Sequence, residues 1–244
     1  MPLPPPVSSA VLSTAPRLSP DETTVRRRLD HHQRGGPPDR RRLRGDADLN
    51  PDFGEPSSYR DAAVLVPLVA HPHGFSLIFT QRTPHLAAHA GQISFPGGRC
   101  EDDDPGPEQA ALRETWEEIG LPPERVEIIG RLDRYRTRTG FAVTPVVGII
   151  RPPFTLNLDA FEVSEAFEVP LDFFLQPDLP QTCSWEFEGR LRYFFAFPYR
   201  ERFIWGATAG MLMNLREILI ADSPAGSASP PEPIPVPDPL GKRS

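Results

Sequence analysis

The sequence predicts a single α/β domain between two proline-rich arms. Between about residues 61 and 220, runs rich in Val, Leu, Ile and Phe alternate with stretches of helical periodicity. Prolines gather outside that region, with 10 of the 32 in residues 1–60 and 7 in residues 221–244. At roughly 150 residues per domain, the 244 residues suffice for one or two domains. We therefore predict a domain over 61–220, a Pro/Arg-rich N-terminal extension over 1–60 and a disordered Pro/Ser-rich tail over 221–244.

Charge and composition exclude several classes of protein. The net charge is −7, and residues 1–60 carry 10 Arg against 8 acids, which leaves the rest of the chain strongly acidic. A duplex-DNA binder would show a concentrated basic face, so we expect no nucleic-acid partner. Two cysteines make no disulfide framework, and no apolar run reaches the about 20 residues of a membrane span. We expect a cytoplasmic protein with no membrane partner; its oligomeric state is open.

The N-terminal extension contains one predicted helix, near residues 20–34. Ser19 is the expected N-cap, Pro20 suits the first turn, and Glu22 stands where a capping-box acid belongs. The segment from 35 to 56 is charged and rich in turn-forming residues, which predicts a linker.

The domain itself shows both strand and helix patterns. Six segments are predicted strands: 62–70, 75–82, 91–96, 126–135, 141–150 and 190–198. His71–Gly74 predicts a hairpin turn between the first two of them. Residues 163–175 predict a short helical or mixed segment. Helices are predicted over about 107–119 and, as an amphipathic C-terminal helix, over 207–219. Strands mixed with helices define the α/β class.

The helix predicted over 107–119 carries the residues that indicate chemistry. Its larger side chains recur at i, i+3, i+4 and i+7, which predicts one packed face. They are Leu112, Thr115, Trp116 and Ile119. Three carboxylates centre on the opposite side, where we expect them to face solvent. They are Glu114, Glu117 and Glu118.

These carboxylates repel one another by a few tenths of a kcal/mol per pair. A divalent cation such as Mg²⁺, which takes oxygen ligands, would offset that repulsion. An acidic helix face by itself is more often solvated surface, so the flanking residues decide between the two interpretations.

The flanking residues resemble the signature of the Nudix hydrolases. That signature is G-x5-E-x7-R-E-U-x-E-E-x-G-U, where U is apolar, and this chain reads GGRCEDDDPGPEQAALRETWEEIGL over 97–121. The matching residues are Gly98, Arg113, Glu114, Glu117, Glu118, Gly120 and Leu121. Asp104 replaces the first acid, the loop after it is one residue longer, and Thr115 stands where an apolar residue is usual.

A second motif resembles the coenzyme A pyrophosphatase branch of that family, in which Asp104 and the longer loop are also familiar. The branch carries L-L-T-x-R-[ST]-x3-[RK]-x3-G-x3-F-P-G-G, and this chain reads IFTQRTPHLAAHAGQISFPGG over 78–98. Ala87 stands where the motif has a basic residue. The resemblance spans most of residues 61–220 and implies a Nudix-type α/β/α sandwich with a mixed β-sheet.

The resemblance implies a divalent-metal-dependent hydrolase with Mg²⁺ or Mn²⁺ as cofactor and a small-molecule nucleotide as substrate. Coenzyme A or a derivative would be cleaved at its diphosphate bond to 4′-phosphopantetheine and adenosine 3′,5′-bisphosphate. Because of Ala87, the same chemistry on ADP-ribose or a dinucleoside polyphosphate stays open. A non-catalytic nucleotide-binding module is the third hypothesis, which the intact glutamates disfavour.

The expected metal ligands lie on the predicted helix. Glu114 and Glu118, at i and i+4, share one helix face and are the first choice. Glu117 is a further ligand or a catalytic residue. Arg113 either orients a glutamate or is a structural ion-pair partner. Arg82 is the candidate phosphate contact.

The remaining candidates lie outside the helix. Gly97 and Gly98 are expected to shape the substrate-binding loop, because glycine lets the backbone approach a ligand closely. The general base is sought in a second acidic segment that contains Glu162, Glu165 and Glu168. Of these we choose Glu165.

Five further residues have both a functional and a structural interpretation. For His85 and His89 we favour a turn or a substrate contact over a metal pair. Cys100 is expected to be an inert thiol, since no base is adjacent to it in the sequence. Tyr135 and Phe141 are candidates for stacking on adenine, although core packing is favoured.

Overall fold

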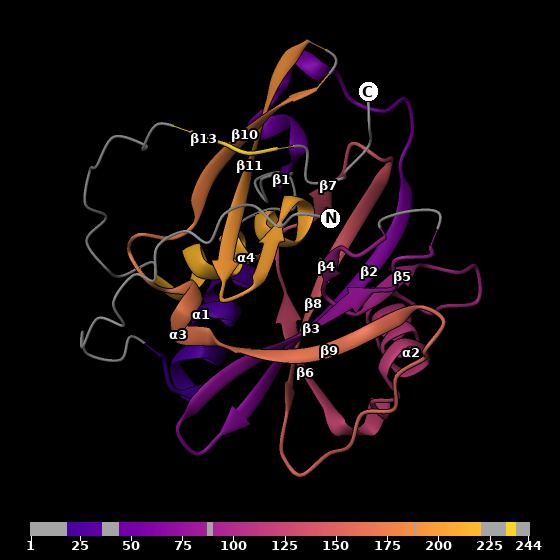
Figure 1. Ribbon diagram of the computed structural model, residues 1–244. Coiled ribbons are helices and arrows are strands. Elements are labelled where there is room, and N and C mark those ends of the chain that lie inside the picture. The colour runs from indigo at the N-terminus through magenta and orange to yellow at the C-terminus, as the bar shows by residue number, and fades with distance from the viewer. Residues whose placement is uncertain (1–18, 36–43, 87–89, 188, 221–232, 238–244) are drawn as a thin grey trace.

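Two β-sheets and the helices around them make up the protein (Figure 1). The computed structural model describes residues 19–35, 44–86, 90–187, 189–220 and 233–237. Within these residues the larger sheet has nine strands and the smaller sheet has four.

The larger sheet is mixed. Its main path runs β1–β7–β8–β2–β3–β4, and β5, β6 and β9 pair with β2, β8 and β3 respectively. Its strands are β1 Arg44–Gly45, β2 Arg60–His71, β3 Gly74–Arg82, β4 Ile93–Ser94, β5 Gly97–Arg99, β6 Val126–Arg131, β7 Tyr135–Arg136, β8 Phe141–Ile150 and β9 Val163–Pro170. Strand β2 lies parallel to β8 and antiparallel to β3 and β5. The predicted α/β class with a mixed sheet is confirmed.

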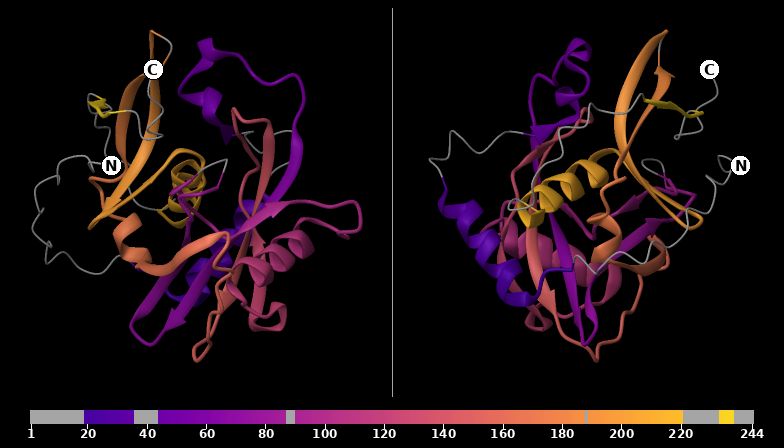
Figure 2. Two further views of the ribbon diagram at one scale, coloured as in Figure 1. Left: turned by 45° about the vertical axis from the view of Figure 1, so that its right-hand side comes forward. Right: turned by 90° about the vertical axis from the view of Figure 1, so that its left-hand side faces the viewer.

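Helices cover both faces of this sheet. They are α1 Glu22–Arg34, α2 Pro107–Ile119, α3 Leu171–Phe174 and α4 Gly206–Ile220, with 3₁₀ turns η2 Asp46–Asp48, η3 Pro51–Phe53 and η4 Pro123–Arg125. Helix α2 packs on one face in a core with Ala63 and Leu65, and α1 and α4 pack on the other with Leu68 and Val147. Figure 2 shows strands of the sheet between α2 and α4. Each fully buried Leu or Val side chain of these cores stabilises the fold by about 1.5–3 kcal/mol.

The smaller sheet was only partly predicted. It contains β10 Gln181–Phe187, β11 Arg190–Tyr199, β12 Arg202–Trp205 and β13 Ile234–Pro235, in the order β12–β11–β10–β13. Only β11 matches a predicted strand. Strand β13 lies in the tail that we expected to be disordered, yet it pairs in parallel with β10, and the backbone N–H of Val236 donates to the carbonyl of Ser184 at 2.8 Å. The rest of the tail, 221–232 and 238–244, lies outside the described residues.

The N-terminal extension differs from expectation in two ways. The cap of α1 is Asp21, whose side chain accepts from the backbone N–H of Thr24 at 2.8 Å, because Asp21 directly precedes the first helical residue. Residues 44–56, expected to be linker, pack onto the domain: Asp46 accepts from the Tyr135 hydroxyl at 2.9 Å, and Asn50 donates to the Tyr193 carbonyl at 2.8 Å. Residues 36–43 lie outside the described residues.

The C-terminal helix is less amphipathic than expected. In α4 nine residues are buried, among them the polar Thr208 and Asn214. The reason is that α4 contacts α1, β11 and β12 as well as the core of the larger sheet, so little of its circumference is left for water. Of the helices described, none is long and apolar enough to cross a lipid bilayer.

Candidate active site

Helix α2 forms as predicted, and three residues of its predicted packed face contact the core: Thr115 and Ile119 are buried, and Leu112 is partly buried. Pro107 opens it, and Gly120, at φ +66°, ends it by donating its N–H to the Trp116 carbonyl at 2.9 Å. The buried side chains are Ala110, Ala111, Thr115, Glu118 and Ile119, while Trp116 is 51% exposed. The expected packing of Trp116 is therefore wrong. The small alanines let the helix approach β2 closely, and this contact selects the buried face.

Glu118 is buried, which contradicts the expected display of all three carboxylates to solvent. Only 5% of the residue is exposed. Its carboxylate accepts from the Gly97 N–H at 3.2 Å and lies 3.5 Å from the nearer Arg82 nitrogen. Burial raises the pKa of Glu118 to about 7, because these two partners do not offset the loss of water. The carboxylate is thus deep in the protein with few donors.

Arg113 links the flanking acids to the helix. It donates from Nε and Nη2 to the Asp104 carboxylate at 3.2 and 2.9 Å, and from Nη1 to Glu114 at 3.0 Å and Glu117 at 3.1 Å. Its Nη2 also donates to the Arg99 carbonyl at 3.0 Å. The guanidinium hydrogen bond holds the pKa of Asp104 below its usual range. Asp104 anchors Arg113, and Arg113 orients Glu114.

The two glycines of β5 make room for the glutamates. Gly98 lies opposite Ala63 of β2, and a Cβ atom on it would stand 2.3 Å from Oε2 of Glu114. Gly97, at φ +144°, takes a conformation that glycine adopts readily and directs its N–H to Glu118. The strand therefore serves as a cradle for both carboxylates.

Glu162 adds a third carboxylate from a second segment. An oxygen of Glu162 lies 3.8 Å from Nη2 of Arg82, whose Nη1 faces Glu118. The negative charge of Glu162 contributes to raising the pKa of both Glu114 and Glu118, where burial is the larger cause. We call Glu114, Glu118 and Glu162 the acidic cluster. Strand β9 begins just after Glu162 and runs beside α2 (Figure 1).

The other two acids of the second acidic segment, Glu165 and Glu168, have partners outside the acidic cluster. Glu165 is ion-paired with Arg202 at 2.5 Å. Glu168 lies 2.7 Å from the ring nitrogen of His71 and accepts from the Ser76 hydroxyl. The structure brings Glu162 to the acidic cluster and leaves Glu165 and Glu168 with partners of their own.

The acidic cluster offers the oxygen ligands that a hard divalent cation prefers, although its side chains are not arranged as a complete metal site. Among the described residues, no three His, Cys, Asp or Glu side chains are close enough together to hold a metal ion. However, Glu114 and Glu118 are carboxylates whose pKa values burial raises, and the carboxylate of Glu114 lies directly against Gly98. A dication would replace the lost solvation of these oxygens. The residues present fit such an ion.

The histidine of the loop after β3 has an aromatic partner. The ring centroids of His85 and Phe161 are 5.0 Å apart. His89 and Ala87, which the sequence also singled out, lie outside the described residues.

Three other candidates have structural surroundings. Burial raises the pKa of the Cys100 thiol, which keeps it protonated at neutral pH. Tyr135 is 7% exposed and gives its hydroxyl to Asp46, so its ring belongs to the core. The ring of Phe141 is covered by the guanidinium of Arg60, 4.4 Å from the ring centroid.

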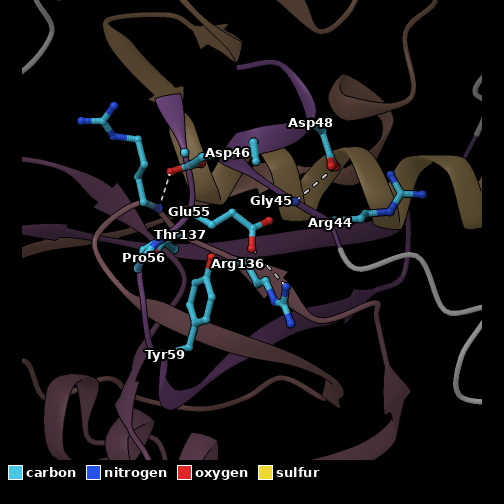
Figure 3. A pocket seen from close by; sticks show the side chains of 12 residues that line it. Arg44, Gly45, Asp46, Asp48, Glu55, Pro56, Tyr59, Arg136 and Thr137 are labelled. Carbon is cyan, nitrogen blue, oxygen red and sulfur yellow. Dashed lines mark hydrogen bonds and ion pairs between the residues drawn. The ribbon is translucent and has the colours of Figure 1, made fainter. Parts of the chain in front are cut away.

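A cavity that the sequence did not indicate lies apart from the acidic cluster. It opens between residues 44–59 and β7, and Figure 3 shows Glu55 turned toward Arg136, which is 3.4 Å away. None of the predicted site residues lines it. Most of its wall comes from the segment that was expected to be a linker, which explains why sequence reasoning missed it.

Comparison with known proteins finds a matching family model and curated relatives. A family model described as the NUDIX domain matches residues 59–181. The chain is 42% identical over 161 residues to the "uncharacterized Nudix hydrolase NudL" of Escherichia coli K12, which covers 66% of this chain and 83% of that protein.

Solved structures also match. A Nudix hydrolase from M. smegmatis, RenU, has 20% identity and a TM-score of 0.44 over 72% of this chain and 96% of that chain. The NUDIX domain of Shewanella oneidensis NrtR complexed with ADP ribose has 19% identity and a TM-score of 0.36 over 51% of this chain and 80% of that chain.

Proposed function

This chain belongs to the Nudix hydrolase family, and from that premise we propose that it cleaves the diphosphate bond of coenzyme A or a derivative. Nudix hydrolases are pyrophosphatases that act on small nucleotide-containing molecules and generally use divalent metal ions. The products would be 4′-phosphopantetheine and adenosine 3′,5′-bisphosphate. One observation carries the proposal: the motif over 78–98 that resembles coenzyme A pyrophosphatases ends at the acidic cluster, where Arg82 and Gly97 both contact Glu118.

Mg²⁺ or Mn²⁺ would be held by Glu114 and Glu118, with Glu117 as a further ligand or a catalytic group. When bound, the cation neutralises phosphoryl oxygens and makes water a better nucleophile toward phosphorus. This also accounts for an acidic protein that takes an anionic substrate.

The chain's own residues supply position and proton transfer. Arg113 holds Glu114 in place through the bonds described above. Arg82 offers donors to a substrate phosphate. Among the described residues its buried Nε has no hydrogen-bond partner, and its terminal nitrogens lie 3.5 Å from Glu118 and 3.8 Å from Glu162. Glu162, which is partly exposed and faces Arg82, would accept the proton of the attacking water. We propose Glu162 in place of Glu165 as the base, because the Arg202 ion pair occupies Glu165.

The same chemistry on ADP-ribose or a dinucleoside polyphosphate is the second candidate. Ala87 favours it, since the motif of the coenzyme A branch has a basic residue at this position. If that cation serves the coenzyme A substrate, its loss shifts preference toward other nucleotides.

Product analysis on a substrate panel tests the proposal. The purified protein is incubated with Mg²⁺ or Mn²⁺ and coenzyme A, acetyl-coenzyme A, ADP-ribose or NADH, and the products are resolved by chromatography. We expect the highest kcat/KM for a coenzyme A compound. Faster turnover of ADP-ribose would support the second candidate. No turnover with retained nucleotide binding would overturn the hydrolase and support a non-catalytic module.

A matched pair of variants tests the base. Glu162→Gln should lower kcat, whereas Glu165→Gln should leave it within about threefold, since a general base contributes roughly 10²–10⁴-fold. The opposite pattern would return the role to Glu165.

A further inference from the structure

Two exposed aromatic rings stand together where strands β3 and β9 leave the sheet. Phe161 is 65% exposed, and His85 is also exposed. Their ring planes are inclined by 60° at a centroid distance of 5.0 Å. The described residues leave this aromatic surface exposed to water. Because hydration of a large apolar ring is unfavourable, a ligand that covers the pair would gain binding free energy.

The same two chain segments deliver the ionic groups of the candidate active site. Arg82 precedes His85 by three residues, and Glu162 directly follows Phe161. Thr83 ties the segments together: its N–H donates to the Glu162 carbonyl at 2.9 Å and its hydroxyl to the Phe161 carbonyl at 2.7 Å. The position of the rings is therefore coupled to that of Arg82 and Glu162 by hydrogen bonds.

The rings are also within a short reach of the acidic cluster. Three residues of extended chain span at most about 11 Å, which bounds the distance between the Cα atoms of Arg82 and His85, and adjacent Cα atoms are about 3.8 Å apart. A nucleotide whose diphosphate lies at Arg82 and the acidic cluster can thus direct its base to the aromatic pair.

We propose that His85 and Phe161 form a stacking platform for the base of a nucleotide substrate. The inference rests on the proposed function. The platform would bind the base, whereas the acidic cluster would bind the diphosphate. Every base has a π-face, so stacking on these rings accepts the adenine of several diphosphates. The platform contributes to binding rather than to the chemical step, because neither ring is among the groups proposed to hold the metal ion, contact a phosphate or accept the proton.

Substitutions that separate ring stacking from hydrophobicity test the platform. Phe161→Leu keeps an apolar side chain and removes the π-face, and Phe161→Tyr keeps the ring. We expect Phe161→Leu to raise KM for coenzyme A or ADP-ribose by about 5- to 100-fold with unchanged kcat, and Phe161→Tyr to stay within about twofold. Leu191→Ala is the matched control, since Leu191 is an exposed apolar residue, 57% exposed, on β11 of the other sheet.

A base-free substrate distinguishes stacking from a general defect. A dialkyl diphosphate diester, which has no ring, should show the same KM with all variants. Equal shifts for both substrates, or none for either, would overturn the platform.

Binding of AMP, measured by calorimetry, keeps the two proposals separable. If the wild-type protein binds AMP and Phe161→Leu weakens that binding while Phe161→Tyr does not, the platform stands even if no substrate is hydrolysed. If the wild type hydrolyses diphosphates but AMP binds both variants equally, the platform is wrong and the proposed function stands.

Discussion

Glu118 and Asp133 are carboxylates with the same small exposed fraction in different parts of the molecule, and their pKa values shift in opposite directions. Each residue is 5% exposed. The pKa of Glu118 is raised to about 7, with burial as the main cause. The pKa of Asp133 lies below its ordinary value although burial acts on it in the raising direction. A small exposed fraction alone therefore does not decide in which direction the pKa of a carboxylate shifts.

The number of donors explains the difference. Asp133 faces His32 at 3.0 Å, Arg44 at 3.2 Å and Asn214 at 3.1 Å, which come from α1, β1 and α4. Glu118 has one backbone N–H and a more distant arginine. A fully paired carboxylate joins elements of the fold, whereas an under-paired one is suited to an incoming cation.

The sharpest test of the comparison is Glu118→Gln. We expect kcat/KM with Mg²⁺ to fall about 1,000-fold, since metal-assisted charge stabilisation is worth several kcal/mol at about 1.4 kcal/mol per tenfold. The melting temperature of the metal-free protein should not fall at neutral pH, because the change removes a buried charge with few donors and the amide still accepts from Gly97. The exposed Glu124→Gln is the control. A loss of several degrees in Glu118→Gln would give Glu118 a structural role.

Asp133→Asn should have the reverse effect. The change removes the charge that faces His32 and Arg44, although Arg44 keeps its ion pair with Glu217, and it should cost about 1–3 kcal/mol of the free energy of unfolding. Urea unfolding at neutral pH measures this, with the exposed Asp178→Asn as control. Activity at low temperature should remain near that of the wild type. An unchanged unfolding midpoint would show that the donors around Asp133 contribute little.

The two carboxylates also predict opposite responses to pH in the metal-free protein. Glu118 has a folded pKa of about 7 against 4.5 as its ordinary value, so the folded state binds a proton more tightly. The free energy of unfolding should therefore fall as pH rises from about 4.5 to about 7, by up to about 3 kcal/mol, and stay level above that range. The contribution of Asp133, whose folded pKa is lowered, is present at neutral pH and is lost only below its ordinary value of 3.8.

Denaturation in the presence of a chelator at about pH 5 and about pH 8 measures this slope. Glu118→Gln should flatten it. A slope that persists in the variant would assign it to other groups.

The smallest effects are expected for substitutions of the two glycines of β5, which distinguish a change in the position of the glutamates from a loss of stability. Gly98→Ala puts a Cβ against the tip of Glu114, a flexible group, so we expect activity to fall about 10- to 100-fold and stability to change by less than about 1 kcal/mol. In Gly97→Ala the Cβ would stand 2.4 Å from the Ala63 carbonyl oxygen, at φ +144°, which should cost about 1–3 kcal/mol of stability. Thermal melts and kinetics on both variants check this. Equal stability losses in both would mean that β5 is simply intolerant of side chains.

The sequence by itself determined the elements whose signal is local. The strands β2, β3 and β8 and the helix α2 lie where side-chain periodicity and turn residues predict them. The motif from Gly98 to Leu121, which includes Arg113 and the three glutamates of the helix, was enough to indicate the family, because it is contiguous in the sequence.

Only the tertiary structure decided which face of α2 is buried, which acid of the second segment approaches it, and where the N-terminal segment packs. Periodicity sets the angles between the side chains of one helix, but it does not decide which of them pack against the sheet. In α2, Ala110 and Ala111 are buried and Trp116 is exposed. The partners of Asp133 include His32, 101 residues earlier in the chain, a separation that no local pattern records. Burial and pairing depend on contacts between segments distant in sequence, and these set the different chemistry of Glu118 and Asp133.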